Sequence, residues 1–251
     1  MGNDKRKNMK KLIYTTAVNT IDRAIDDVDI FNTTRLSWEH YCDRHDIDFY
    51  VIDEELHPNT SPHWFRYWIF DLKPDYDRYM YVDTDIMVKW NAPNIFDKFG
   101  SEDIHAVRDN SGLSWIWEGI NGYQTMFPDV HVDWDKYFNS GVLLFSNKHQ
   151  EVINHFKEFY ISNQPIIKDY RNRLRKGFDQ NIFNYFLTWY GQEVKLISEK
   201  WNFFHMIRRE VLYNGYFLDM AYFWHFNGLD RNTQVKFIQD VWSKIEGNYE
   251  K

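Results

Sequence analysis

The sequence predicts a single α/β domain with a central sheet covered by helices. Short β-rich runs alternate with amphipathic helical segments along the chain, which is the pattern of β-α-β units. At 251 residues the chain is long enough to cover both faces of such a sheet with helices. It contains no internal repeat, low-complexity tract or interdomain linker. We therefore expect one domain over residues 12–251, preceded by a polar extension at residues 1–11.

The first half of the chain predicts strands and helices in alternation. Residues 12–18 are a β-rich run, the apolar side chains of residues 38–45 recur at helical spacing, and residues 49–52 resemble a second strand. Residues 62–72 begin with a proline, which suits the first turn of a helix, and keep a helical apolar spacing. The apolar run at residues 79–82 then predicts a buried strand.

The second half continues this alternation around one segment without periodicity. Strands are predicted at residues 104–108, 140–145, 194–197 and 222–226. Amphipathic helices are predicted at residues 146–160, 179–187 and 235–245, with Ser146 and Asp179 as N-cap candidates for the first two. Residues 109–136 show no clear periodicity, and long irregular segments of compact domains are usually binding loops or lids. We therefore expect a functional loop there.

The bulk composition argues against several classes of protein. A formal net charge of -7 and an isoelectric point near 5.8 do not suit a nucleic-acid binder, which needs a basic surface to displace counterions. The single cysteine, Cys42, excludes an internal disulfide and a multi-cysteine metal site, and it indicates a reducing compartment. No apolar stretch approaches the roughly 20 residues of a membrane helix. We expect a soluble, cytoplasmic protein, for which peripheral contact with a membrane stays open.

Two aspartates, Asp83 and Asp85, directly follow the apolar run at residues 79–82. Because strand side chains alternate between faces, both carboxylates are expected to point the same way. Two carboxylates at the end of a buried strand offer hard oxygen ligands to a divalent cation, and open α/β sheets bind ligands at that edge. Taken alone, such a triplet is more often a solvated turn, because aspartate is common where strands end.

Three more short motifs lie at the boundaries of predicted elements. They are FNSGV (138–142), DQN (179–181) and HFNG (225–228). Each has an ordinary explanation by itself: the stretch from Asn139 to Gly141 suits a turn, Asp179 suits a helix N-cap, and a lone histidine after an apolar run is usually a satisfied core residue. Their order and spacing along the chain favour a shared functional site over these separate explanations.

Together the motifs resemble the retaining nucleotide-sugar glycosyltransferases of family 8, which include glycogenin and bacterial lipooligosaccharide galactosyltransferases. The resemblance spans residues 12–231. It is strong at YMYVDTDIMV (79–88), YFNSGVLLFSNK (137–148) and DQNIFN (179–184), and looser at WNFF (201–204) and HFNG (225–228). It implies the GT-A (Rossmann-like) fold, with a mixed, mainly parallel central sheet flanked by helices. It also implies transfer of a hexose from a UDP-sugar to a hydroxyl acceptor.

In that family a Mn²⁺ (or Mg²⁺) ion bridges the donor diphosphate, and the matching ligands here are Asp83, Asp85 and His225. Two carboxylates and one imidazole suit Mn²⁺ better than a metal that prefers soft ligands. The ion would stabilise the charge that develops on the nucleoside diphosphate leaving group. Gly228 would let the backbone approach the diphosphate, and Arg231 stands about where the family has a phosphate-binding lysine.

Further positions match residues that bind the donor in the family. They are Thr15, Thr16, Ala17, Arg66, Thr84 and Asn139. Ala17 falls where many members have an aspartate that recognises uracil, so UDP is expected from the resemblance alone. Arg66 has an alternative interpretation as a surface arginine that pairs with Asp71 or Glu55.

The transferred sugar would meet two of the motifs. Asn139 and Asp179 match residues that hold its hydroxyls, and Gln180 matches the group beside the reacting anomeric carbon. Because glutamine is a poor nucleophile, we expect same-face attack by the acceptor within a short-lived ion pair rather than a covalent intermediate. The anomeric configuration would then be retained.

The acceptor would lie near the segment without periodicity. Asp109 matches a position near the acceptor sugar in some members of the family. Trp115 and Trp117 either stack on a sugar ring or simply pack the loop, and the sequence favours neither interpretation.

Two other functions agree with parts of this pattern. Phosphohydrolases of the haloacid dehalogenase type also carry Asp-x-Asp at a strand end. Their motif lies on the first strand and is followed by threonine, whereas here a β-α-β segment precedes it and Met87 occupies the threonine position. The second alternative is a non-catalytic GT-A module that binds a sugar nucleotide or a glycan. The complete set of motif residues argues against a degenerate site.

Overall fold

The computed structural model describes residues 9–18, 26–176, 179–212 and 215–249. Most of the polar extension predicted at residues 1–11 lies outside these ranges, and its last residue already belongs to the first strand. No helix within the described ranges combines the length and the apolar character that crossing a lipid bilayer requires.

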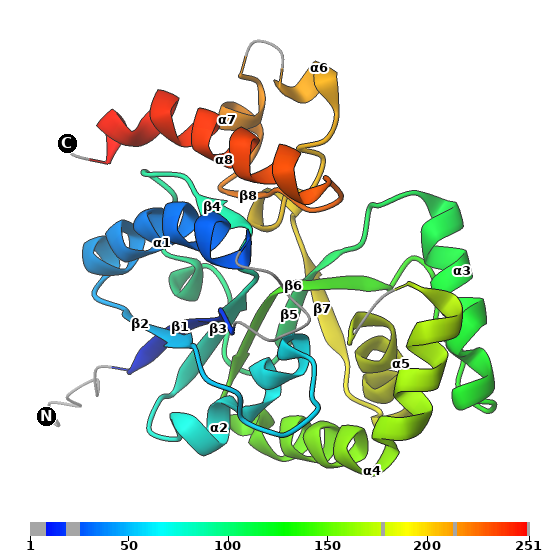
Figure 1. Ribbon diagram of the computed structural model, residues 1–251. Helices are drawn as coiled ribbons and strands as arrows, with labels where there is room; N and C mark the ends of the chain where they lie inside the picture. Colours follow the sequence, from blue (N-terminus) through cyan, green and yellow to red (C-terminus); the bar gives the residue numbers. More distant parts are fainter. Residues whose placement is uncertain (1–8, 19–25, 177–178, 213–214, 250–251) are drawn as a thin grey trace, which may run out of the picture.

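A mixed sheet of six strands forms the centre of the molecule (Figure 1). Its strands are β1 (Lys11–Thr16), β2 (Asp48–Ile52), β3 (Arg78–Val82), β5 (Ile104–Arg108), β6 (Phe138–Ser146) and β7 (Val194–Ile197). In the order β2-β1-β3-β6-β5-β7, the pairs β1–β2, β1–β3 and β5–β7 are parallel, and β6 runs antiparallel to both of its neighbours. The mixed, mainly parallel sheet is therefore confirmed.

Strand alternation divides the core between the two faces of the sheet. Tyr14 and Tyr81 point into one hydrophobic cluster, whereas Ile13 and Met80 point into another. The second cluster is covered by α1 (Asp26–His45). The first is covered by helices that include α2 (Ile69–Leu72), α3 (Leu113–Tyr123), α4 (Gln150–Leu174) and α5 (Gln180–Tyr190). Figure 1 shows α1 and α4 on opposite sides of the sheet.

A second, two-stranded sheet lies beside the first. β4 (Ile86–Val88) pairs antiparallel with β8 (Phe223–His225), and both pack in a third hydrophobic cluster with α6 (Arg209–Leu212), α7 (Phe217–Met220) and α8 (Arg231–Ile245). The sequence predicted a strand at residues 222–226 but missed β4. Three residues are too few to show an apolar alternation.

Two predicted elements differ from the structure. The helix predicted at residues 62–72 is mostly a 3₁₀ helix, η1 (Pro62–Trp68), and only its end is α-helical. The loop predicted at residues 109–136 is wrong in part, because it contains α3, followed by η3 (Gln124–Met126). The buried face of α3 does have helical spacing, but the exposed tryptophans between its apolar positions hide it in the sequence. The remaining 3₁₀ turns are η2 (Ile95–Asp97), η4 (Asn147–His149), η5 (Glu199–Trp201) and η6 (Glu246–Asn248).

Candidate functional site

The candidate site forms where the turn Asp83-Thr84-Asp85 connects the two sheets. At its start, the backbone N–H of Asp83 donates to the carbonyl oxygen of Gly141 on β6 at 2.9 Å. At its end, the N–H of Phe226 donates to the carbonyl oxygen of Asp85 at 3.0 Å, and β4 pairs with β8 so that Ile86 lies opposite His225. The pairing of β4 with β8 therefore carries His225 to a motif that lies far earlier in the chain.

The two aspartates converge through this turn and not through strand alternation. β3 ends at Val82, and the N–H of Ile86 donates to the carbonyl oxygen of Asp83 at 3.2 Å. The carbonyl oxygen of Thr84 accepts a hydrogen bond from the hydroxyl of Thr34 at 2.6 Å, which ties the turn to α1. The turn is not freely solvated, because the side chains of Asp83 and Asp85 are only 25% and 17% exposed.

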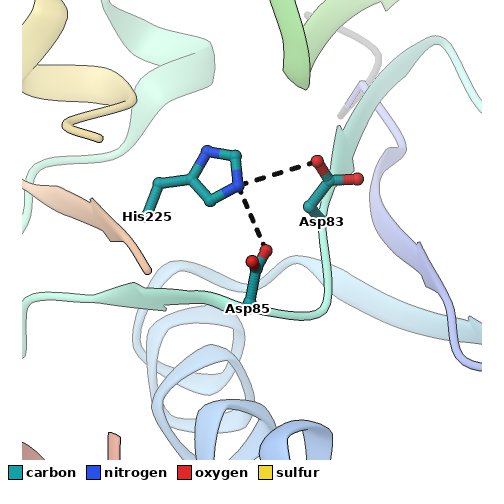
Figure 2. Close-up of side chains that lie close together, drawn as sticks. All are labelled: Asp83, Asp85 and His225. Atoms are coloured by element: carbon teal, nitrogen blue, oxygen red, sulfur yellow. Dashed lines mark ion pairs between the residues drawn. The ribbon is translucent and has the colours of Figure 1, made fainter. Parts of the chain in front are cut away.

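Asp83, Asp85 and His225 each offer one atom that could bind a metal ion, and these three atoms lie within 4.8 Å of one another (Figure 2). The Nε2 atom of His225 is 3.1 Å from Oδ1 of Asp85 and 3.8 Å from Oδ2 of Asp83. Adjacent ligands around an octahedral ion with bonds of about 2.1 Å lie about 3 Å apart. The spacing and chemistry of this group therefore fit a divalent cation that takes oxygen and nitrogen ligands.

Hydrogen bonds fix which ring nitrogen of His225 can bind a metal. The backbone N–H of Gly141 donates to Oδ1 of Asn139 at 2.9 Å, so this oxygen is an acceptor. It also accepts from Nδ2 of Asn202 at 2.8 Å, which turns Oδ1 of Asn202 toward Nδ1 of His225 at 2.9 Å. Because that oxygen can only accept, Nδ1 carries a hydrogen, and in the neutral ring Nε2 faces the aspartates with its lone pair.

Two residues that the sequence did not assign to the site thus position the candidate ligands. Asn202 holds the ring of His225, and Nε2 of Gln234 donates to Oδ2 of Asp85 at 2.8 Å. Asn202 belongs to the WNFF motif, so its position in the resemblance was a usable signal. Gln234 lies on α8 among other polar residues, and nothing in the local pattern distinguishes it.

Replacing Asn202 with alanine is expected to weaken Mn²⁺ binding by about 10- to 100-fold, the usual effect of losing a residue that orients a metal-binding histidine. The ring of His225 would lose the acceptor that fixes its tautomer. The dissociation constant can be measured by electron paramagnetic resonance of free Mn²⁺. Asn248→Ala, whose side chain bonds only locally to the carbonyl oxygen of Ile245, is the matched control. Equal Mn²⁺ affinity of Asn202→Ala and the control would contradict the positioning role.

The charged groups of the site shift one another's pKa. Burial alone would lower the pKa of His225, but the carboxylates of Asp85 and Asp83 raise it above its ordinary value. Burial would raise the pKa of Asp85, but the charge and hydrogen bond of His225 lower it. A proton and a divalent cation therefore compete for Nε2 of His225.

Arg66 is a buried link between two carboxylates. It is 2% exposed, and its guanidinium donates to Oδ1 of Asp83 at 2.9 Å and to the carbonyl oxygen of Ser140 at 2.7 Å, while its Nε lies 3.5 Å from Oδ2 of Asp179. The alternative of a surface arginine is therefore wrong. Burial would lower the pKa of Arg66, but Asp179 and Asp83 raise it. The arginine stays charged and fixes both carboxylates.

Asp179 and Gln180 begin α5, and neither side chain acts as a helix cap. Asp179 occupies the N-cap position, but its Oδ2 accepts a hydrogen bond from the hydroxyl of Tyr67 at 2.7 Å instead. Burial raises the pKa of Asp179, although Arg66 and Tyr67 oppose the shift. The Nε2 atom of Gln180 donates to Oδ2 of Asp109 at 2.7 Å, and its Oε1 accepts from the backbone N–H of Ser140 at 3.2 Å. Both ends of the Gln180 amide are thus held.

A cavity of about 1470 Å³ contains most of the predicted site residues. Those that line it are Thr16, Arg66, Asp83, Thr84, Asp85, Asp109, Trp115, Asn139, Asp179, Gln180, His225, Gly228 and Arg231. Thr15 and Ala17 do not line it: Thr15 is buried in β1, and the N–H of Ala17 donates to the carbonyl oxygen of Ile52. Trp117 also lies outside the lining and is 44% exposed. The volume exceeds the roughly 300–1,000 Å³ of most small-molecule sites, so the cavity has room for more than one ligand.

Gly141 is a site residue that the sequence placed in a predicted strand, with a plain turn as the ordinary explanation of its motif, and did not assign to the site. It lies inside β6, and a Cβ atom added to it would lie 2.6 Å from Cε1 of His225 and 2.9 Å from Oδ2 of Asp83. A glycine within a strand often marks such a close approach, which was the available signal. Gly228 has a φ of 77°, a left-handed conformation that suits glycine. The backbone can approach a ligand closely at both positions.

Comparison with known proteins extends these observations. Residues 5–231 match the sequence model of glycosyl transferase family 8. A comparison with curated protein sequences finds no match.

Solved structures of glycosyltransferases share the architecture. A glycosyltransferase involved in the glycosylation of the major capsid of PBCV-1 is similar over 92% of this chain and 99% of that chain, with a TM-score of 0.61 and 14% identity. The galactosyltransferase LgtC, solved with donor and acceptor sugar analogs, gives a TM-score of 0.51 at 14% identity over 93% of this chain and 96% of that one. The apo structure of the bifunctional WbbM gives 0.51 at 14% identity, over 96% of this chain and 52% of that one. At these identities the likeness shows a shared GT-A fold.

Proposed function

The chain belongs to glycosyltransferase family 8, and from that premise we propose that it is a metal-dependent, retaining enzyme that moves a hexose from a UDP-sugar to a hydroxyl acceptor. The observation that carries the proposal is the convergence of Asp83, Asp85 and His225 on the wall of the large cavity. A glycan, a lipid-linked sugar or a protein could supply the hydroxyl. The GT-A fold gives no support to the alternative of a haloacid dehalogenase-type phosphohydrolase.

The donor diphosphate would lie against the candidate metal group. Asp83, Asp85 and His225 would hold Mn²⁺ or Mg²⁺, which supplies Lewis-acid stabilisation of the departing nucleoside diphosphate. Gly228 would admit the diphosphate close to the backbone, and Arg231 would add a cation from the start of α8. Arg66 holds Asp83 in place, so that one of its oxygens stays oriented toward His225.

The sugar would lie between Asn139, Asp179 and Gln180, all of which line the cavity. The amide of Gln180 is held by Asp109 and by the backbone of Ser140, so it can orient a sugar. Because an amide is a poor nucleophile, Gln180 supports a retaining reaction without a covalent intermediate. The acceptor hydroxyl would then attack from the face that the diphosphate leaves. Asp109 would lie on the acceptor side of Gln180.

A donor screen tests this function. The protein is incubated with Mn²⁺ and a panel of nucleotide sugars, and release of nucleoside diphosphate is measured, followed by NMR of the product to assign its anomeric configuration. Release from a UDP-hexose and a retained configuration are expected. Binding of donors without any release would favour a non-catalytic sugar-nucleotide module, and an inverted product would overturn the retaining mechanism.

Variants of the two exposed tryptophans of α3 test whether these rings bind the acceptor or only pack the loop. Trp115 lines the cavity, whereas Trp117 does not. Trp115→Ala is expected to raise the KM for the acceptor about two- to tenfold, the contribution of one ring-stacking contact, and to leave donor hydrolysis intact. Trp117 is similarly exposed on the same helix, so Trp117→Ala should leave both unchanged and serves as the control. The same acceptor KM for both variants would mean that Trp115 does not contact the acceptor.

A further inference from the structure

The C-terminal end of α4 presents cations to the cavity. Lys168, Arg171 and Arg175 all line it: Lys168 and Arg171 lie about one turn apart on α4, and Arg175 follows as its C-cap in a left-handed conformation. We call these three residues the basic stripe. The chain as a whole has a net charge of -7, which makes a cationic cavity wall a local feature.

Other cations at this helix end are neutralised. Arg173, on another side of α4, pairs with Asp169 at 2.9 Å, and Lys176 pairs with Glu118. By contrast, neither Lys168 nor Arg175 forms an ion pair with any carboxylate that the structure describes. Lys168 and Arg175 therefore leave positive charge facing the cavity.

The stripe lies on the acceptor side of the proposed reaction centre. Nζ of Lys176 is 5.1 Å from the ring centroid of Trp115, and the hydroxyl of Tyr123 on α3 donates to the carbonyl oxygen of Lys176, so the end of α4 packs against α3. The proposed diphosphate position lies instead near β8 and the start of α8, where Arg231 lines the cavity. Figure 1 shows α8 well separated from α3 and α4.

We propose that the acceptor carries an anionic group, a phosphate or a carboxylate, that the basic stripe binds while the acceptor hydroxyl lies near Gln180. Arginine forms charge-assisted, often bidentate hydrogen bonds with both kinds of anion. This inference rests on the proposed function of the cavity. It adds the chemical class of the acceptor, which the metal and donor residues do not determine.

The test compares glucose 6-phosphate with glucose, which share a ring and differ by one phosphate. Their dissociation constants are measured by ligand-observed NMR at low ionic strength, with saturating UDP and Mn²⁺ to fill the donor end of the cavity. The protein should bind glucose 6-phosphate about tenfold more tightly, the contribution of one charge-assisted hydrogen bond. Arg171→Gln combined with Arg175→Gln should abolish this preference. Arg173→Gln, on the same helix end but outside the cavity, should keep it.

Several results would overturn the inference. Equal binding of the two sugars by the unmodified protein would show that the cavity does not select an anion. A preference that survives in the double variant but disappears in Arg231→Gln would place the phosphate at the donor end. Vesicles containing phosphatidylglycerol provide a third arm: if the double variant loses vesicle binding while its sugar preference is unchanged, the stripe binds a membrane surface instead.

The donor screen distinguishes failure of the anionic-acceptor inference from failure of the proposed function. If the unmodified protein releases no nucleoside diphosphate from any donor, the proposed function fails whatever the sugar preference. If it does release nucleoside diphosphate but shows no preference for the phosphorylated sugar, only the anionic acceptor is wrong.

Discussion

Asp85→Asn is expected to reduce nucleoside diphosphate release from the donor on the order of 100-fold or more, since it removes one charged ligand of the candidate metal. The carboxylate of Asp85 lies 3.1 Å from Nε2 of His225 and is held from its other side by Gln234. Asparagine keeps the size of the side chain, so the turn should keep its shape. The loss should come with a higher dissociation constant for Mn²⁺, and added Mn²⁺ should restore part of the rate.

Asp97→Asn is the matched control for this change. Asp97 is exposed, pairs with Lys11 and does not line the cavity. Its variant should retain both turnover and Mn²⁺ affinity. A fully active Asp85→Asn, or one whose rate falls while Mn²⁺ binds as before, would remove Asp85 from the metal site.

Gly141→Ala is expected to have a comparable effect without removing any ligand. The added Cβ would lie 2.6 Å from Cε1 of His225 and 2.9 Å from Oδ2 of Asp83, closer than atoms can approach. The backbone of Gly141 cannot easily move, because its N–H bonds to Asn139 and its carbonyl oxygen accepts from Asp83. The two ligand side chains must therefore shift. Overpacking of about 1–3 kcal/mol predicts an Mn²⁺ affinity that is about 5- to 150-fold weaker.

The same measurements on Gly100→Ala provide the control, because no atom lies within 4 Å of a Cβ added at Gly100. Circular dichroism and thermal unfolding show whether Gly141→Ala keeps its fold. A folded Gly141→Ala protein that binds Mn²⁺ as tightly as the unmodified chain would show that the two ligands have more room than the structure gives them.

Elements with a clear local pattern could be predicted from the sequence. The strand predicted at residues 104–108 has the bounds of β5, and the closing helix at residues 235–245 lies within α8. Buried strands and amphipathic helices reveal themselves because neighbouring residues share one environment. β4 could not be found this way because it is short, and α3 because exposed tryptophans interrupt its apolar face.

The sequence by itself determined the elements with a clear local pattern, the motif residues and the family that they resemble. Only the tertiary structure decided which of these residues meet. The pairing of β4 with β8 brings His225 to the aspartates, and Asn202 and Gln234 reach the site from other elements. The tertiary structure also buries Arg66 and leaves Trp117 outside the cavity. The physical reason is that such contacts join residues distant in the chain, so they depend on how the two sheets and their helices pack and not on any local pattern.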